Sequence, residues 1–249
     1  MKFGNEIKTF SGDIQIMFNT LKIGENFAFS KFADGELAIL KGQNIDLTQK
    51  CNGEFKYNQN EKLDEVFRDR LMQSLKLQDP RYFVGIGCPC CIGNEDFQLM
   101  KNMTDQQFQN YERMTWANIF VNSNYHYYVE NFIPLFREKK VILVCNEKAN
   151  ISQLFPNLVK DFRIGTNAWI ENFHIIYEIK KYIKENKISD HIFLFAAGPL
   201  GNLLTYYLFA ENQNNTYLDI GSTLDPFIGL GGTRGYHVGA PTLNKVCIW

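Results

Sequence analysis

The sequence lacks an excess of charge of either sign. Its 26 lysine and arginine residues nearly balance its 27 aspartate and glutamate residues, which gives a formal net charge of −1 at pH 7. Non-specific binding to nucleic acid or to acidic lipid needs a basic excess, so the overall composition argues against both partners. A local groove can still carry charge, and 45% hydrophobic residues are enough for a globular core.

The chain also lacks an apolar leader and an uninterrupted membrane-length segment. It opens with the polar stretch MKFGNEIKTFSGD, unlike a secretory signal. One long uncharged stretch spans residues 192–210, but Gly198-Pro199 and Gly201-Asn202 interrupt it. This favours a buried strand, a tight turn and an apolar helix over a bilayer helix. We therefore expect a cytoplasmic protein without a transmembrane segment.

The spacing of the cysteines does not fit a paired zinc knuckle. The six cysteines are Cys51, Cys88, Cys90, Cys91, Cys145 and Cys247. Zinc knuckles place two residues between cysteines and a second cysteine pair downstream, whereas the GCPCCIG segment has neither this spacing nor a following His–Cys pair. The sequence therefore predicts free buried thiols in a cytosolic chain.

Internal repeats and linkers rich in glycine, proline or serine are absent, and apolar runs of strand length alternate with amphipathic stretches of helix length. The predicted strands span residues 26–33, 81–87, 139–145, 161–165, 191–197 and 216–221. The predicted helices span residues 61–77, 104–121 (with Thr104 as N-cap), 168–186 and 200–212. This alternation predicts a single α/β domain over residues 1–249, of Rossmann-like type, with a largely parallel sheet and helices on both faces.

Glycines and polar residues follow five of the predicted strands. Ligands bind beyond the carboxyl ends of the strands in such sheets, so these residues are candidates for a binding site. In chain order they are Asp34 and Glu36; Gly85 and Gly87; Asn146, Glu147 and Lys148; Gly198, Pro199, Leu200 and Gly201; and Asp219, Gly221 and Ser222.

The triplet Asp34-Gly35-Glu36 has two interpretations. In an extended chain, residues i and i+2 point to the same face, so both carboxylates could bind one Mg²⁺ or Mn²⁺ together with substrate phosphates. Alternatively, the triplet is a turn or the start of a helix, where Asp-Gly and acidic residues are common. Taken alone, the triplet favours the turn.

Two glycine-containing segments are candidates for contact with an anion. In FAAGPLGNLL (195–204), a helix beginning near Leu200 would direct free N–H groups at a diphosphate; the alternative is a simple strand-to-helix turn. GLGGTRGYHVG (229–239) does not match the dinucleotide fingerprint, because the third glycine would fall on Arg234. We expect the segment 229–249 to lie as a loop over the active site, with Arg234 on a phosphate and His237 as a proton acceptor; the alternative is a solvated arginine and a surface histidine.

The strand end in NTYLDIGSTLDPF (215–227) is similar to the cofactor-binding strand of S-adenosylmethionine methyltransferases. That strand normally opens the fold, whereas here fewer than about 30 residues follow, too few for several crossover units. A second glycine is also missing, because position 223 is Thr223. Such a nucleotide- or S-adenosylmethionine-binding enzyme is one alternative, and a non-catalytic module that keeps the fold is another.

Five segments together resemble a known family. FSKFADGE (29–36) is similar to the opening S-R-Y-G-D-G-E pattern of glycosyltransferases of the GT-D fold, whose defining feature is an Asp-x-Glu metal motif. VILVCNEKANISQLFPN, FRIGTNAW, FLFAAGPLGNLLTYYLF and YLDIGS resemble later family segments in the same order. The family's Arg-Tyr-Gly is Lys31-Phe32-Ala33 here, which keeps the charge but loses the bidentate fork of arginine, and its histidine after Asp-Ile-Gly is Ser222.

The resemblance implies a metal-dependent enzyme that transfers a hexose from a nucleotide-diphosphate sugar, with a UDP-sugar as expected donor, to a glycan or glycoconjugate hydroxyl. Asp34 and Glu36 would then bind Mn²⁺ or Mg²⁺. The expected donor-binding residues are Ser30, Lys31, Phe32, Asn146, Glu147, Gly198, Pro199, Leu200, Gly201, Gly221, Ser222 and Arg234. The candidates for a catalytic base are Asp225, Asp219 and His237, with Asp225 favoured because it lies one short loop beyond a strand end; the alternative for Asp225 is a turn before Pro226. The oligomeric state is open.

Overall fold

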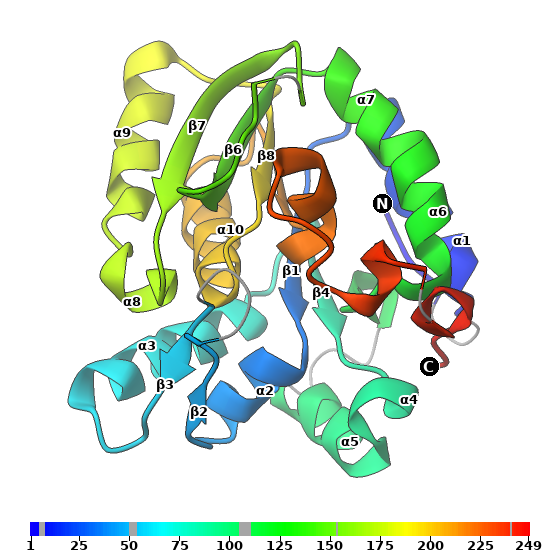
Figure 1. Ribbon diagram of the computed structural model, residues 1–249, viewed down its shortest axis with the longest axis vertical. Coiled ribbons are helices and arrows are strands. Elements are labelled where there is room, and N and C mark those ends of the chain that lie inside the picture. Colours follow the sequence, from blue (N-terminus) through cyan, green and yellow to red (C-terminus); the bar gives the residue numbers. More distant parts are fainter. Residues whose placement is uncertain (5–7, 50–53, 105–110, 153, 240) are drawn as a thin grey trace.

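The computed structural model describes residues 1–4, 8–49, 54–104, 111–152, 154–239 and 241–249. Within them, seven parallel strands form one sheet in the order β5-β4-β1-β9-β8-β6-β7 (Figure 1). The strands are β1 (Ala28–Phe32), β4 (Tyr82–Ile86), β5 (Met114–Trp116), β6 (Val141–Asn146), β7 (Leu158–Ile164), β8 (Ile192–Phe195) and β9 (Thr216–Asp219). The predicted α/β class and parallel sheet are confirmed.

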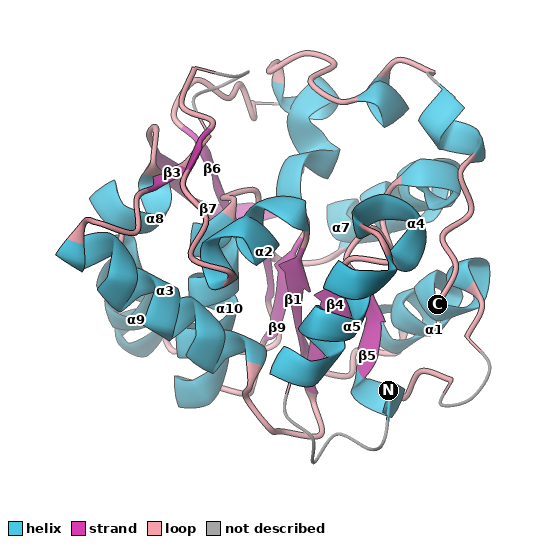
Figure 2. Ribbon diagram, turned by 90° about the horizontal axis from the view of Figure 1, so that it is seen from below, coloured by secondary structure: helices cyan, strands magenta, loops and turns pink. Residues whose placement is uncertain are grey.

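Helices pack on both faces of the sheet, as Figures 1 and 2 show. One face is covered by α2 (Asp34–Leu40), α3 (Lys62–Leu75), α5 (Asn94–Met103), α8 (Ala168–Glu171), α9 (Ile175–Asn186) and α10 (Pro199–Glu211), and the other by α1 (Phe10–Lys22), α6 (Tyr125–Tyr127) and α7 (Ile133–Glu138). Side chains of the first strand alternate between the two cores: Ala28 and Phe32 join the first, whereas Phe29 joins the second. Burial of both faces is the reason why the strands appear in the sequence as continuous apolar runs.

Short elements connect these layers. They are the antiparallel pair β2 (Ile45–Asp46) and β3 (Lys56–Tyr57), the short helix α4 (Pro89–Ile92), the 3₁₀ turns η1 (Tyr111–Arg113), η2 (Asn122–Asn124), η4 (Gly221–Ile228), η5 (Gly235–His237) and η6 (Pro241–Asn244), and the π-helical η3 (Tyr128–Phe132). Several of them, including β2, β3 and η4, belong to the loops at the carboxyl ends of the strands.

The predicted helix over residues 104–121 is wrong. Thr104 ends α5 instead of beginning a helix, and its hydroxyl donates to the carbonyl of Lys101 at 2.7 Å. Residues 105–110 lie outside the described residues. Met114–Trp116 then form the edge strand β5, which pairs with Val84–Ile86 of β4. This pairing is a long-range contact that local periodicity does not encode.

The predicted helix over residues 168–186 is interrupted. α8 ends at Glu171 and α9 begins at Ile175. Between them, the side-chain oxygen of Asn172 accepts the backbone N–H of Gly165 at 3.0 Å, so this residue turns towards the loop that follows β7. A side chain that bonds to a nearby backbone group competes with helix continuation.

The long apolar stretch folds as predicted. It forms β8, a turn at Ala196–Gly198 and most of α10. Among the helices of the described residues, none combines the length and the apolar character needed to cross a bilayer. In the sheet, β8 pairs with β9 and β9 with β1, so the chain segments that follow these three strands come together at one edge.

Candidate active site

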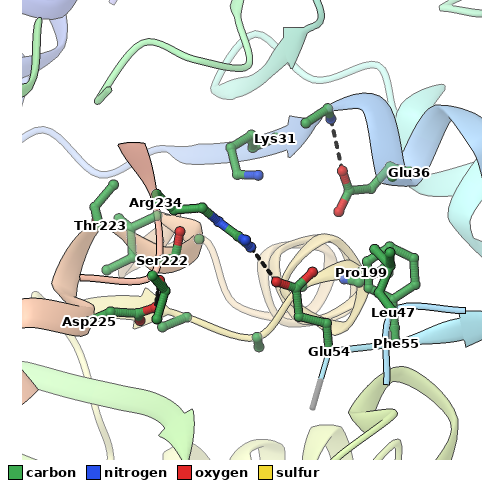
Figure 3. Close-up of a pocket in the computed structure, with 18 of the residues that line it drawn as sticks. Lys31, Glu36, Leu47, Glu54, Phe55, Pro199, Ser222, Thr223, Asp225 and Arg234 are labelled. Atoms are coloured by element: carbon green, nitrogen blue, oxygen red, sulfur yellow. Dashed lines mark hydrogen bonds and ion pairs between the residues drawn. The ribbon is translucent and has the colours of Figure 1, made fainter. Parts of the chain in front are cut away.

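A cavity of about 550 Å³ lies at the carboxyl edge of the sheet (Figure 3). Four of the five predicted strand ends reach it. Lys31, Asp34 and Glu36 come from the end of β1 and the start of α2, Asn146 from β6, Gly198 and Pro199 from the turn after β8, and Gly221, Ser222 and Asp225 from the segment after β9. Residues 117, 118, 120 and 121, which follow β5, take the place of the glycines after β4. The parallel sheet therefore gathers most of the predicted residues in one cavity.

The ammonium group of Lys31 lies among carboxylates. Burial by itself lowers the pKa of Lys31, but attraction by Glu36, Asp219 and Asp34 outweighs it, so the pKa is raised and the side chain stays charged. Its strand neighbours Ser30 and Phe32 point to the opposite face, because side chains alternate along a strand. Ser30 instead accepts a hydrogen bond from Asn202 at 3.1 Å inside the core, so neither neighbour lines the cavity.

The Asp34-Gly35-Glu36 triplet is helical. It forms the first turn of α2, and Glu36 Oε2 accepts the backbone N–H of Ala33 at 2.9 Å. The extended geometry from which we predicted a shared face is therefore wrong, and the alternative of a helix start is the correct local structure. Nevertheless both carboxylates line the cavity, the exposed Asp34 at its surface and the buried Glu36 deeper inside.

Gly35 is tightly covered by an aromatic ring that the sequence analysis missed. A β-carbon at position 35 would lie 2.7 Å from Cζ of Phe55, and one at Gly198 would lie 3.6 Å from Cδ1 of the same ring. The ring is therefore held between the acidic triplet and the turn after β8, next to Pro199 and Leu47 (Figure 3). The sequence contains no motif around Phe55 that would have identified it.

The turn after β8 needs glycine but offers few free N–H groups. Gly198 has φ +54°, a conformation that other residues rarely adopt. Pro199 is the first residue of α10 and carries no N–H, and the N–H of Gly201 donates to the carbonyl of Gly198 at 2.8 Å. Leu200 and Gly201 are buried and do not line the cavity. This helix start therefore offers fewer free N–H groups to an anion than we predicted.

Asp219 lies beneath the cavity rather than in its wall. Its carboxylate accepts the backbone N–H groups of Lys31 at 3.3 Å and of Gly221 at 3.2 Å. Burial raises the pKa of Asp219 to about 7, although the Lys31 ammonium group opposes this shift. A β-carbon at Gly201 would lie 3.0 Å from the Asp219 carboxyl carbon, so that glycine makes room for the carboxylate. Asp219 therefore acts on the cavity through Lys31.

Asp225 is the predicted base candidate that reaches the cavity. It is 7% exposed, and its Oδ2 accepts a hydrogen bond from the Thr233 hydroxyl at 2.7 Å. Burial raises the pKa of Asp225 to about 6, with the Thr233 hydrogen bond and the Arg234 charge acting in the opposite direction. A carboxylate with this pKa is ionised near pH 7 and more basic than an exposed one.

Arg234 reaches into the cavity from the C-terminal segment and pairs with Glu54 (Figure 3). Glu54 is a second residue that sequence reasoning missed, because it belongs to no recognisable motif. His237 does not line the cavity: its ring packs against Tyr236 and its Nδ1 accepts the backbone N–H of Arg234 at 3.2 Å. Burial lowers the pKa of His237 to about 4, so the ring is neutral near pH 7.

Three further predicted residues have different positions. Asn146 lines the cavity, and its side-chain oxygen accepts the backbone N–H of Lys148 at 2.9 Å. Glu147 is exposed outside the cavity, and its backbone N–H donates to the carbonyl of Ile164 at 2.8 Å. Ser222 lines the cavity and its hydroxyl lies 2.8 Å from that of Tyr236.

The charged groups in the wall of the cavity have an acidic excess. Among the described residues that line it, Asp34, Glu36, Glu54 and Asp225 face only two cations, Lys31 and Arg234. An anionic ligand such as a diphosphate would be repelled by this excess unless a further cation is present. Carboxylate oxygens are the ligands preferred by Mg²⁺ and Mn²⁺, so this set of residues fits such an ion.

Comparisons with known proteins identify the family and the fold of this chain. A family model described as a GT-D fold-like domain matches residues 14–227. The chain is similar to two solved structures of domain of unknown function 1792, one of them selenomethionine-substituted and the other described as a distinct glycosyltransferase fold. Each is 18% identical, with 92% of this chain and 81% of that chain covered, and the TM-scores are 0.57 and 0.58. Among curated proteins, none matches this sequence. The chain therefore belongs to the GT-D-like family, and its fold is a glycosyltransferase fold.

Proposed function

We propose that this chain is a metal-dependent glycosyltransferase that transfers a hexose from a nucleotide-diphosphate sugar, a UDP-sugar, to a hydroxyl of a glycan or glycoconjugate. Family membership and fold support the enzyme class. The observation that carries the proposal is the acidic excess around Lys31 and Arg234 in a cavity at the carboxyl edge of a parallel sheet. Such a cavity suits a diphosphate and a divalent cation bound together.

We assign the binding of the donor diphosphate to Lys31, Arg234 and the Gly198-Pro199 turn. The two cations supply positive charge, and the glycine allows close approach of the backbone. Asp34 and Glu36 would hold Mn²⁺ or Mg²⁺, Asp34 from an exposed position and Glu36 through Oε1, the oxygen that does not accept the Ala33 N–H. When bound, the ion would stabilise the negative charge of the leaving diphosphate.

We assign to Asp225 the role of the base that accepts the proton of the acceptor hydroxyl. Its carboxylate lies in the cavity wall and the pKa of about 6 makes it an effective base near neutral pH. Asp219 accepts the backbone N–H of Lys31 and attracts the Lys31 ammonium group, so it is a positioning residue in this scheme. The rings of Phe55 and Tyr236 line the same cavity and suit the flat face of a nucleobase or sugar.

A thermal-shift experiment tests the proposal. UDP, GDP, CMP and S-adenosylmethionine are added with and without Mn²⁺ to the wild type, to Asp34→Asn and to Asp69→Asn, a control that removes an exposed acid on α3 outside the cavity. A ligand at ~100 times its dissociation constant adds about 2.7 kcal/mol of stability. We expect UDP to stabilise the wild type and the control in the presence of Mn²⁺ only, and not Asp34→Asn.

Two other outcomes would contradict the proposal. Stabilisation by S-adenosylmethionine without metal would indicate a methyltransferase. No shift with any nucleotide would indicate a module that keeps the fold without the activity. A shift with GDP or CMP in place of UDP, still dependent on Mn²⁺ and Asp34, would change the donor but keep the enzyme class.

A further inference from the structure

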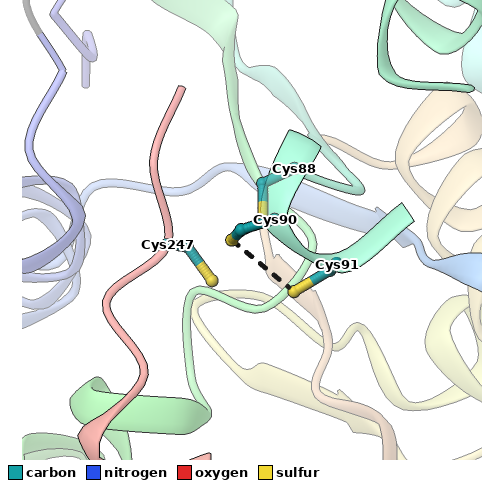
Figure 4. Close-up of side chains that lie close together, drawn as sticks. All are labelled: Cys88, Cys90, Cys91 and Cys247. Carbon is teal, nitrogen blue, oxygen red and sulfur yellow. Dashed lines mark hydrogen bonds between the residues drawn. The ribbon is translucent and has the colours of Figure 1, made fainter. Parts of the chain in front are cut away.

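Four cysteines converge next to the cavity, three of them from residues 88–91 and one from the C-terminal segment. Cys88 follows β4, Cys90 and Cys91 lie in α4, and Cys247 comes from the C-terminal segment (Figure 4). Their four Sγ atoms all lie within 4.8 Å of one another. The expectation of buried thiols is wrong for Cys90 and Cys91, which are exposed, and Cys51 lies outside the described residues. No motif pointed to a fourth ligand, because Cys247 is near the other end of the chain.

The sulfur atoms lie close enough together to bind a single ion. Zinc–thiolate bonds are ~2.3 Å long, so the edge of a tetrahedron of four sulfurs is about 3.8 Å. Here Cys90 Sγ lies 3.0 Å from Cys88 Sγ and 3.9 Å from Cys91 Sγ. These distances, with an upper limit of 4.8 Å for the whole set, bracket that edge, so all four sulfurs are close enough to bind the same ion.

Two side-chain amides donate to the sulfurs. Asn118 Nδ2 lies 3.2 Å from Cys91 Sγ, and Asn122 Nδ2 lies 3.3 Å from Cys247 Sγ. Asn122 is buried and has φ +54°, a conformation that the surrounding structure must hold in place. Hydrogen bonds of this kind orient metal ligands and favour the thiolate over the thiol.

A positive charge also lies beside the cluster. Lys245 Nζ donates to the carbonyl of Cys90 at 2.9 Å. Four thiolates around a divalent cation leave an excess of two negative charges, which a nearby ammonium group partly offsets. The amide donors and this lysine are therefore the surroundings that a zinc–tetrathiolate centre requires.

We propose that Cys88, Cys90, Cys91 and Cys247 bind one structural Zn²⁺. All four ligands come from the protein, so the ion has no open position for substrate, and four thiolates are a ligand set that structural zinc sites use. This site is separate from the proposed divalent-cation site at Asp34 and does not depend on the proposed function.

The ion would fasten the C-terminal segment to the body of the protein. Close to Cys247, the carbonyl of Ile248 accepts the indole N–H of Trp116 at 3.0 Å, and the ring of Trp249 packs against that of Trp116 at 5.5 Å. The same C-terminal segment carries Arg234 into the cavity, and Asn118, the donor to Cys91, also lines the cavity. Zinc therefore stabilises one wall of the candidate active site from outside.

Metal analysis tests this proposal directly. The full chain is purified without a histidine tag, and its zinc and iron contents are measured by mass spectrometry. We expect about one zinc per chain. Cys247→Ser and Cys91→Ser should lose most of the zinc, whereas Cys145→Ala, which removes a buried thiol in β6 outside the cluster, should keep it. Iron in place of zinc, or zinc that both cluster variants retain, would overturn the proposal.

A measurement on the wild type covers the case in which the cluster variants do not fold. A strong chelator is added to the native protein, and released zinc and reactive thiols are counted together. The proposal predicts that zinc release exposes the four cluster thiols to the reagent and that Co²⁺ restores their protection with the visible absorption of tetrahedral cobalt thiolate. Thiols that react fully before chelation, or an intact mass that shows a disulfide among the four cysteines, would refute it.

Discussion

The ring of Phe55 lies against Gly35 so closely that a β-carbon at position 35 would be 2.7 Å from its Cζ. This contact joins the acidic first turn of α2 to the segment that precedes β3. The glycine between the two acids is therefore required by packing, independently of any metal. The ring in turn shapes the cavity, because it also touches the turn at Gly198.

Gly35→Ala should destabilise the protein by roughly 1–3 kcal/mol, because the added methyl group must displace the Phe55 ring. Chemical denaturation measures the effect. In a Phe55→Leu background the same substitution should cost clearly less, since the shorter side chain leaves room. Equal costs in the two backgrounds would show that the contact does not determine the choice of glycine.

Asp225→Asn should lower kcat/KM by roughly 10²–10⁴-fold, since the amide cannot accept the acceptor proton. Because burial raises the pKa of Asp225 to about 6, the activity of the wild type should rise with pH through about 6 as the carboxylate ionises. Thr233→Val removes a hydrogen bond that lowers this pKa and should move the rise in activity to higher pH. If the activity of Thr233→Val rises at the same pH as that of the wild type, the titrating group is not Asp225.

Arg234→Lys should weaken donor binding about tenfold, a loss of about 1.4 kcal/mol, because lysine keeps the charge but loses the planar fork. The dissociation constant of the nucleotide in the presence of Mn²⁺ measures this. Arg81→Lys is the matched control, since Arg81 is exposed and precedes β4 at the opposite edge of the sheet. Equal affinities of the two variants for the nucleotide would show that Arg234 does not bind the donor.

Asp13 should make stability depend on pH. It accepts a hydrogen bond from Thr115 at 2.7 Å, and burial raises its pKa to about 6. A raised pKa means that the folded state binds more protons than the unfolded state. The stabilisation from Asp13 is therefore fully present below about pH 4 and is lost as the pH rises through about 6. Lys8 stays charged in this window because burial lowers its pKa only to about 8.

The expected loss of stability from Asp13 is up to about 3 kcal/mol, because its pKa of about 6 in the folded protein lies above its ordinary value of 3.8. Asp13→Asn keeps an oxygen for the Thr115 hydroxyl and should lack this part of the pH dependence. Denaturation of both proteins at several pH values between about 4 and 7 measures the difference. A stability difference that stays constant across this range would contradict the raised pKa.

Some features followed from the sequence because local pattern encodes burial. Continuous apolar runs such as residues 139–145 and 191–197 predicted strands covered on both faces, and they form β6 and β8. Since parallel strands end at one edge, the residues after them were expected to meet, and Asp34, Asn146 and Ser222 line one cavity. The alternation of strands and helices was sufficient for the α/β class.

Other features depended on contacts between distant segments. Only the tertiary structure placed β9 next to β1, which brings Asp219 beneath Lys31. It also made Met114–Trp116 an edge strand, and it placed the Phe55 ring against the acidic triplet. Strand pairing is a property of the whole sheet, and periodicity within one segment carries no information about its neighbours.

The sequence by itself determined the fold class and the edge of the sheet where the cavity lies, because periodicity and strand ends are local properties of the chain. The tertiary structure alone decided which side chains share that cavity: Glu54 and Phe55 come from a segment without a motif. It also decided that Cys247 meets Cys88. The reason is physical, since a site is defined by distances in space, and these follow from packing of the whole domain.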